Sequence, residues 1–116
     1  MAVKNVRESR MNLDRNGFKK IPYDLPTELV VLSMTDNRLE DIDARNVENF
    51  EQMRNLREVY LSGNFFHVVY DYQLRHFTRL NILTLKDNPL VSTWSRARIR
   101  FVRLNSCGRF SSVVVL

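Results

Sequence analysis

The chain has 116 residues, of which 44% are hydrophobic, and a net charge of +5. This length fits one domain, and the apolar content supports a buried core and argues against intrinsic disorder. The apolar runs are too short for a membrane helix, and no early stretch joins a basic start to a long apolar centre, so no secretory signal is expected. Cys107 is the only cysteine, which excludes an intrachain disulfide and a cysteine-based zinc site.

One pattern of apolar residues and asparagine recurs over residues 11–90. In an eleven-residue pattern, apolar residues occupy positions 1, 4, 6 and 11, an asparagine occupies position 9, and the other positions vary. A truncated copy comes first, with Met11, Leu13, Asn16 and Phe18, and three full copies follow: Leu29, Leu32, Met34, Asn37 and Leu39; Leu56, Val59, Leu61, Asn64 and Phe66; Leu80, Leu83, Leu85, Asn88 and Leu90. The asparagines are 21, 27 and 24 residues apart, a spacing typical of repeat proteins.

Each copy predicts a short strand whose alternate side chains, such as Leu32 and Met34, point to one side. A single copy cannot bury these side chains, but stacked copies form a parallel sheet over a continuous core. The asparagine falls where the chain turns away from the strand. Its amide can both donate and accept, so we expect it to satisfy backbone groups that the turn leaves unpaired.

The segments that return from one strand to the next differ in the residues they contain. After Asn16, Pro22 and Pro26 exclude a helix and predict an extended return. After Asn37, Asp43 is predicted to cap a short helix that runs to about Arg54. The residues expected to point inward are Val47, Phe50 and Met53 in this helix, and Leu74 and Phe77 in the next return.

The last 26 residues differ from the rest in composition. They contain five arginines and no acidic residue, whereas the other 13 of the 18 basic residues balance the 13 acidic ones, so we place a boundary near Val91. The segment fits a helix, with Trp94, Ala97, Phe101 and Leu104 on one face, or a strand, with Ala97, Ile99 and Phe101 alternating with arginines. We expect an element that caps the last repeat. The final Val113–Leu116 fits a buried last strand, an exposed one, or a peptide that pairs with a partner's sheet edge.

The phased leucines and asparagines resemble the leucine-rich repeat family. The run from Asn16 to Asn37, with Ile21-Pro22 and Leu25-Pro26, is similar to the short repeat of extracellular members, such as small leucine-rich proteoglycans and Toll-like receptor ectodomains. The resemblance covers residues 11–90 and implies an extracellular matrix or receptor protein. The chain departs from these families because it lacks their cap cysteines and has no Asn-x-Ser/Thr site, so a fragment, a truncated product and a cytoplasmic relative are the alternatives.

The resemblance implies an α/β fold: a short curved leucine-rich repeat solenoid with a parallel β-sheet on the concave face and mostly irregular or short-helical convex returns. Residues 1–10 are a lead-in, residues 11–90 hold about four repeats, and residues 91–116 are a basic C-terminal cap or tail. A stack this short is expected to be marginally stable, which favours a homodimer or a longer chain of which this is a part.

The predicted function is non-enzymatic binding of a protein partner on the concave face. The register predicts the contact residues, which are Tyr60, Glu58, Val31, Ile82, Ser33, Thr84, Lys86 and Asp36. Tyr60 is the expected anchor, with Val31 and Ile82 as an apolar floor and the charged residues as a polar rim. Alternatively, Tyr60 only packs across strands on a solvated sheet.

A second hypothesis is binding of a polyanion, such as a glycosaminoglycan, nucleic acid or acidic membrane, through Arg96, Arg98, Arg100 and Arg103. No catalytic motif occurs, so we expect no enzyme, no cofactor and no small-molecule substrate. His67 and His76 lie nine residues apart, a spacing that favours surface histidines over a metal site.

Overall fold

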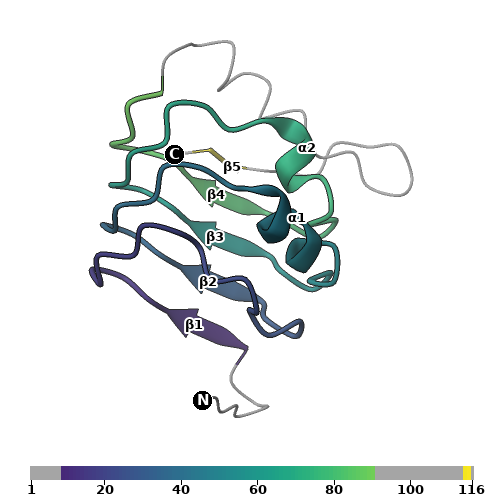
Figure 1. The fold of residues 1–116 in the computed structure, drawn as a ribbon. Helices are drawn as coiled ribbons and strands as arrows, with labels where there is room; N and C mark the ends of the chain where they lie inside the picture. The colour runs from purple at the N-terminus through teal and green to yellow at the C-terminus, as the bar shows by residue number, and fades with distance from the viewer. Residues whose placement is uncertain (1–8, 91–113, 116) are drawn as a thin grey trace.

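The computed structural model describes residues 9–90 and 114–115 of the chain. These residues form a parallel sheet with two short helices, in agreement with the predicted α/β class (Figure 1). The elements in chain order are β1 (Arg10–Asn12), β2 (Val31–Ser33), α1 (Ala44–Phe50), β3 (Glu58–Tyr60), α2 (Asp71–Leu74), β4 (Ile82–Thr84) and β5 (Val114–Val115). The strands lie in the order β1-β2-β3-β4-β5, so each strand pairs with the next one in the sequence.

The register of the sheet matches the phase of the sequence pattern. Leu32 pairs with Val59, and Val59 with Leu83, so the central residues of three strands form one row. All three side chains are buried, whereas Val31 and Ser33 on either side of Leu32 are half-buried. The alternation follows from the strand period of two, which sends successive side chains to opposite faces of the sheet. The predicted strands and their inward residues are therefore confirmed.

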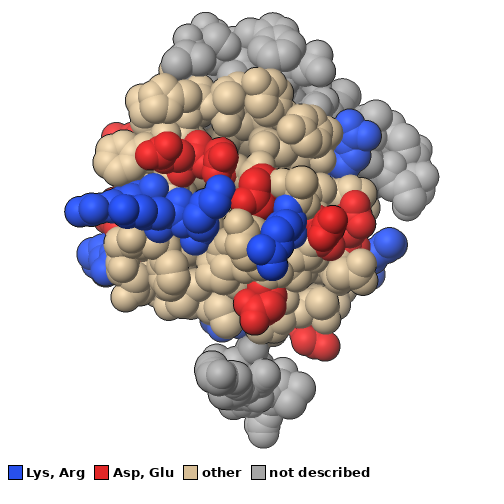
Figure 2. Space-filling model, in the orientation of Figure 1, with Lys and Arg blue, Asp and Glu red and all other residues tan. Residues whose placement is uncertain are grey.

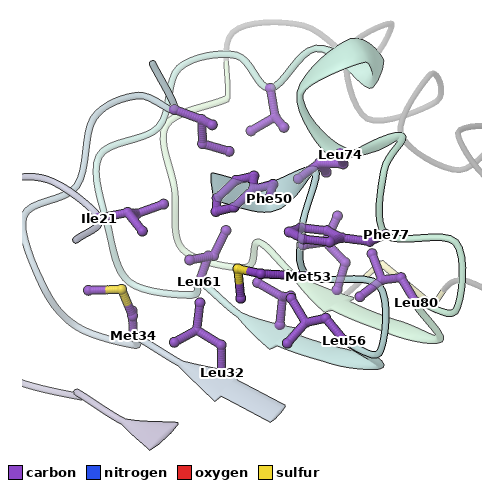
Figure 3. Packing of buried hydrophobic residues seen from close by; sticks show 14 of the residues in the cluster. Ile21, Leu32, Met34, Phe50, Met53, Leu56, Leu61, Leu74, Phe77 and Leu80 are labelled. Atoms are coloured by element: carbon purple, nitrogen blue, oxygen red, sulfur yellow. The ribbon is translucent and has the colours of Figure 1, made fainter. Parts of the chain in front are cut away.

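The core lies between the sheet and the return segments (Figure 3). Phe50 from α1 and Phe77 from the following return meet there, with ring centroids 4.8 Å apart. Met53, Leu56 and Leu80 are fully buried beside them. Large buried side chains of this kind each contribute roughly 1.5–3 kcal/mol to folding, so the inner faces of the returns and the sheet hold each other in place.

Successive strands are also joined by the asparagines that follow them. The Asn64 amide nitrogen donates to the carbonyl oxygens of Met34 and Leu61, at 3.0 Å each, and its oxygen accepts from the Leu39 N–H at 3.0 Å. Asn37 makes the equivalent bonds toward the preceding strand, to Leu13 and Phe18. Asn88 repeats the arrangement one strand later. The predicted role of these asparagines in satisfying turn backbone is confirmed.

The return after Asn37 contains the helix that Asp43 was expected to cap. Asp43 is the N-cap of α1, where its side chain accepts from the Asn46 N–H at 3.0 Å and the Asn46 side chain accepts from the Asp43 N–H at 3.1 Å. The predicted end near Arg54 is wrong, because α1 stops at Phe50. Tighter turns follow, in which the N–H of Met53 donates to the Phe50 carbonyl, and they place Met53 in the core.

The other two returns differ as the sequence indicates. The return with Pro22 and Pro26 forms no helix, and Ile21 and Leu25 are buried in it. In the return after Asn64, Leu74 and Phe77 are buried as predicted. The short helix α2 in that return was not predicted, because a single turn leaves too short an apolar pattern to recognise.

The predicted lead-in and basic tail, which include Trp94, Phe101 and Leu104, lie outside the described residues except for two short stretches. Ser9 directly precedes β1, which begins at Arg10, and Val114–Val115 form β5. Pairing of β5 with β4 supports the last-strand reading of the C-terminal valines. Within the described residues, no helix has the length and apolar character needed to cross a membrane.

Candidate functional site

The side of the sheet that faces away from the core is the candidate site, and we call it the outer sheet face. The register places Val31, Glu58 and Ile82 in one row across β2, β3 and β4, and Ser33, Tyr60 and Thr84 in the next. Adjacent parallel strands lie about 4.8 Å apart, so residues in one row are immediate neighbours. Six of the eight predicted contact residues therefore lie in these two neighbouring rows.

Tyr60 and Glu58 form the centre of the outer sheet face. The Tyr60 hydroxyl donates to Glu58 Oε1 at 2.7 Å, and both side chains are half-buried. This hydrogen bond, helped by partial burial, raises the pKa of Tyr60 above its ordinary value. Glu58 was predicted to lie on the polar rim, but its row places it between Val31 and Ile82, so the centre combines a carboxylate, a phenol and two aliphatic side chains.

Thr84 departs from the prediction that it lies exposed on this face. It shares the row of Tyr60, but its side chain is buried, at 7% exposure. The Thr84 hydroxyl accepts a hydrogen bond from the Leu61 N–H at 3.1 Å, which ties β4 to the end of β3. Thr84 therefore has a structural contact, and it offers little surface to a partner.

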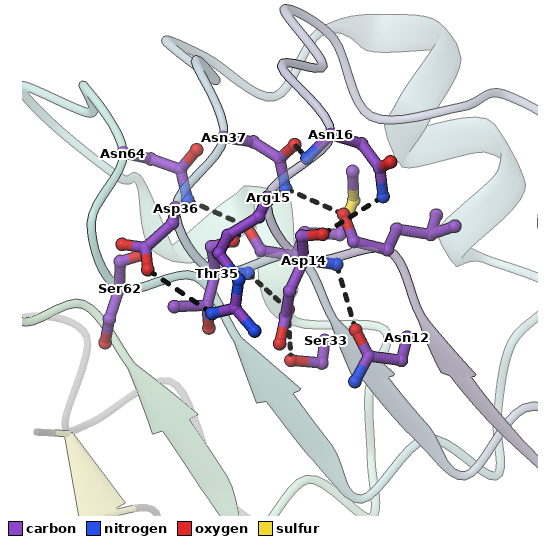
Figure 4. Close-up of polar contacts among 12 residues, drawn as sticks. Asn12, Asp14, Arg15, Asn16, Ser33, Thr35, Asp36, Asn37, Ser62 and Asn64 are labelled. Atoms are coloured by element: carbon purple, nitrogen blue, oxygen red, sulfur yellow. Dashed lines mark hydrogen bonds and ion pairs between the residues drawn. The ribbon is translucent and has the colours of Figure 1, made fainter.

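Lys86 and Asp36 lie at the edge where the strands end, and both are exposed. Asp36 forms an ion pair with Arg15 at 3.8 Å and lies against Gly63 of the next strand end, where any Cβ would overlap its carboxylate (Figure 4). Exposed pairs of this kind contribute at most about 1 kcal/mol. Asp36 therefore fits the predicted rim, and the absence of a side chain at Gly63 is what makes room for it.

The residue before each asparagine of the pattern has a left-handed backbone. The φ angles are +56° at Arg15, +59° at Asp36, +71° at Gly63 and +61° at Asp87. Glycine adopts this region at little cost, and Asp and Asn are enriched there among other residues. This left-handed position was not predicted, although the Asp or Gly before three of the four asparagines was a readable signal.

Asp14 was not among the predicted contact residues, but it bonds to one of them. Its Oδ1 accepts from the Ser33 hydroxyl at 2.7 Å and from the Thr35 N–H at 2.8 Å, so it joins the end of β1 to β2 (Figure 4). The first of these bonds orients Ser33, which the sequence predicted as a contact residue. The rim near β1 and β2 is therefore a network of short polar side chains.

The face turned toward the viewer in Figure 1 has a different character from the outer sheet face. Acidic and basic side chains lie interspersed across it, with uncharged surface between them (Figure 2). One cluster surrounds the start of α1, where Lys20 Nζ lies 3.1 Å from Asp41 and 3.0 Å from Asp43. Its members are paired with one another, so this cluster is best explained as a cap for the helix.

The histidines and the tail arginines complete the set of predicted sites. His67 is exposed, and His76 lies 3.7 Å from Glu51, so the two histidines have different surroundings. Among the described residues, no three His, Cys, Asp or Glu side chains are placed to hold a metal ion. Arg96, Arg98, Arg100 and Arg103 lie outside the described residues, so the polyanion hypothesis remains a prediction.

A comparison of the chain with protein-family models and with curated proteins finds no match. Function is therefore inferred from these residues and their geometry.

Proposed function

We propose that the chain is a leucine-rich repeat module without enzymatic activity, and that it binds a protein partner on the outer sheet face, which would be the concave face of a repeat solenoid. The repeat assignment is supported by the sheet order β1-β2-β3-β4-β5 and by the asparagine bonds that recur at each strand end. Repeat stacks of this kind leave one sheet face free of their own return segments.

The observation that carries the proposal is the composition of the central row. Val31, Glu58 and Ile82 are adjacent and half-buried, and Tyr60 lies beside Glu58. Tyrosine gives a large contact area with little loss of rotamer freedom, and binding energy concentrates on such residues when apolar neighbours exclude water around them. A polar rim with Asp36 and Lys86 matches the usual anatomy of a protein interface.

Replacement of Tyr60 tests the proposal. A chain with a photo-crosslinking amino acid at position 33 would first identify proteins that contact the outer sheet face, and each would then be purified. We expect Tyr60→Ala to weaken binding of the purified partner by more than about 1 kcal/mol, or roughly fivefold in Kd, when measured by calorimetry.

Tyr72→Ala is the matched control, because Tyr72 is an aromatic residue with 51% exposure on α2, away from the sheet. It should leave the affinity unchanged. Equal affinity of the Tyr60→Ala chain and the parent chain would show that Tyr60 only packs across the strands. A partner whose binding disappears at high salt and depends on Arg96, Arg98, Arg100 and Arg103 would support the polyanion hypothesis instead.

A further inference from the structure

The β1 end of the described stack leaves apolar side chains partly open. Met11, Leu13 and Phe18 are only half-buried, whereas their counterparts Leu32, Met34 and Leu39 in the next copy are at most 1% exposed. All three contact the same core cluster. Partly exposed core side chains at the end of a repeat stack favour a further layer that covers them.

Among the described residues, the backbone of β1 forms one edge of the sheet, and two of its residues have backbone groups without a partner there. The N–H groups of Leu13 and Arg15 donate to β2 and its continuation, so the backbone groups of Arg10, Asn12 and Asp14 face away from β2. The Asp14 N–H already donates to the Asn12 side chain at 2.9 Å, and the Asp14 carbonyl accepts from the Asn16 side chain at 3.1 Å. Arg10 and Asn12 therefore present the backbone groups still available along this edge.

We propose that two copies of the chain associate through β1, with the two β1 strands antiparallel about a twofold axis at Met11. Arg10 then lies opposite Asn12 of the second copy, and their outward N–H and carbonyl groups form the hydrogen-bonded pairs of an antiparallel ladder. Met11 meets Met11 of the second copy as a pair without hydrogen bonds, where side chains approach most closely. The exposed core ends of the two stacks cover each other.

One pair of opposite charges meets across β1 under this symmetry. Arg10 is exposed, and among the described residues it belongs to no ion pair. Across the antiparallel pair, its diagonal neighbours on the same face are Asp14 and Arg10 of the second copy, and of these only Asp14 attracts it. Both bonds to the Asp14 carboxylate use Oδ1, which leaves Oδ2 to receive the guanidinium group. The twofold axis makes this contact twice.

Sedimentation equilibrium over a concentration series tests the association. The parent chain should rise from its 13.8 kDa monomer mass toward twice that value as concentration increases. Arg10→Glu places two acids side by side at both symmetric contacts and should weaken the dimer by roughly fivefold or more. Arg54→Glu changes the net charge equally at an exposed site outside β1 and should have no effect. A monomer at every concentration, or equal effects of the two variants, would overturn the proposal.

Oxidative crosslinking tests the geometry. In a Cys107→Ser background, Met11→Cys places two thiols opposite each other in a close antiparallel pair, so a disulfide-linked dimer should form under mild oxidation. Val31→Cys, one strand inward, should give no such dimer. Circular dichroism of each variant confirms that the fold is kept. A covalent dimer from Val31→Cys, or its absence from a folded Met11→Cys chain, contradicts pairing through β1.

Discussion

Single residues at the strand ends set the spacing between neighbouring strands. Asn64 is 3% exposed, and its side chain bonds to backbone groups of its own strand end and of the strand before it. A buried amide that fills all of these roles is costly to replace, because a loss of one partner leaves donors or acceptors unsatisfied at about 1–3 kcal/mol each. Asn16, the first of the series, is exposed. Its side chain donates to the nearby Asp14 carbonyl, and its backbone N–H donates to the Asn37 side chain.

Gly63 gives a prediction about a single contact. Gly63→Ala should destabilise the chain, because alanine is strained at a φ of +71° and because its Cβ would displace the Asp36 carboxylate. Gly17→Ala is the matched control, since Gly17 has a φ of +72° and an alanine Cβ there would meet no atom within 4 Å beyond its own chain neighbours. Both variants should lose about 1 kcal/mol to strain. Gly63→Ala should lose roughly a further 1 kcal/mol in urea unfolding. Equal losses would show that the Asp36 contact contributes nothing.

At the scale of elements, α1 shows what the sequence could and could not predict. Its start was predicted correctly, because Asp43 is a strong N-cap residue and the capping geometry is local. Its end was not, because burial of Met53 and Leu56 against the sheet interrupts the helix after Phe50. Tertiary packing overrides the helical pattern there, and the apolar pattern of this one segment does not indicate where the segment must leave the helix to pack against the sheet.

The cap of α1 also predicts a pH dependence. Burial opposes ionisation of Asp43, but bonds from the Tyr23 hydroxyl, the Asn46 N–H and Lys20 outweigh it and lower the pKa of Asp43 to about 2. A carboxyl whose folded pKa lies below its ordinary value of 3.8 stabilises the fold above pH 4. That contribution should be lost as the pH falls from about 4 toward 2, since the unfolded chain takes up the proton first.

Urea unfolding at a series of pH values measures this contribution. The free energy of unfolding of the parent chain should fall more steeply between about pH 4 and pH 2 than that of Asp43→Asn, which cannot titrate at this site. Asp24→Asn removes an exposed carboxyl from the neighbouring return and serves as the control. Parallel pH profiles for the parent chain and Asp43→Asn would mean that the cap carries no charge-dependent stability.

At the scale of the whole molecule, periodicity predicted the order of the strands and their register, because a repeated core pattern can be buried only by stacking one copy on the next. The same periodicity placed Tyr60 and Val31 on the outer sheet face. It did not reveal that Thr84 is buried or that Glu58 lies between two aliphatic side chains, since these depend on side-chain packing and on hydrogen bonds across strands.

The central claim is that Asn37, Asn64 and Asn88 lie in line and bind successive strand ends together. Proton NMR distances test it most directly. The side-chain amide protons of Asn37, Asn64 and Asn88 should show cross-peaks to the backbone amides of Phe18, Leu39 and Phe66 respectively, and should exchange slowly with solvent. Rapid exchange of all three side-chain amides, without these cross-peaks, would contradict the stacked arrangement.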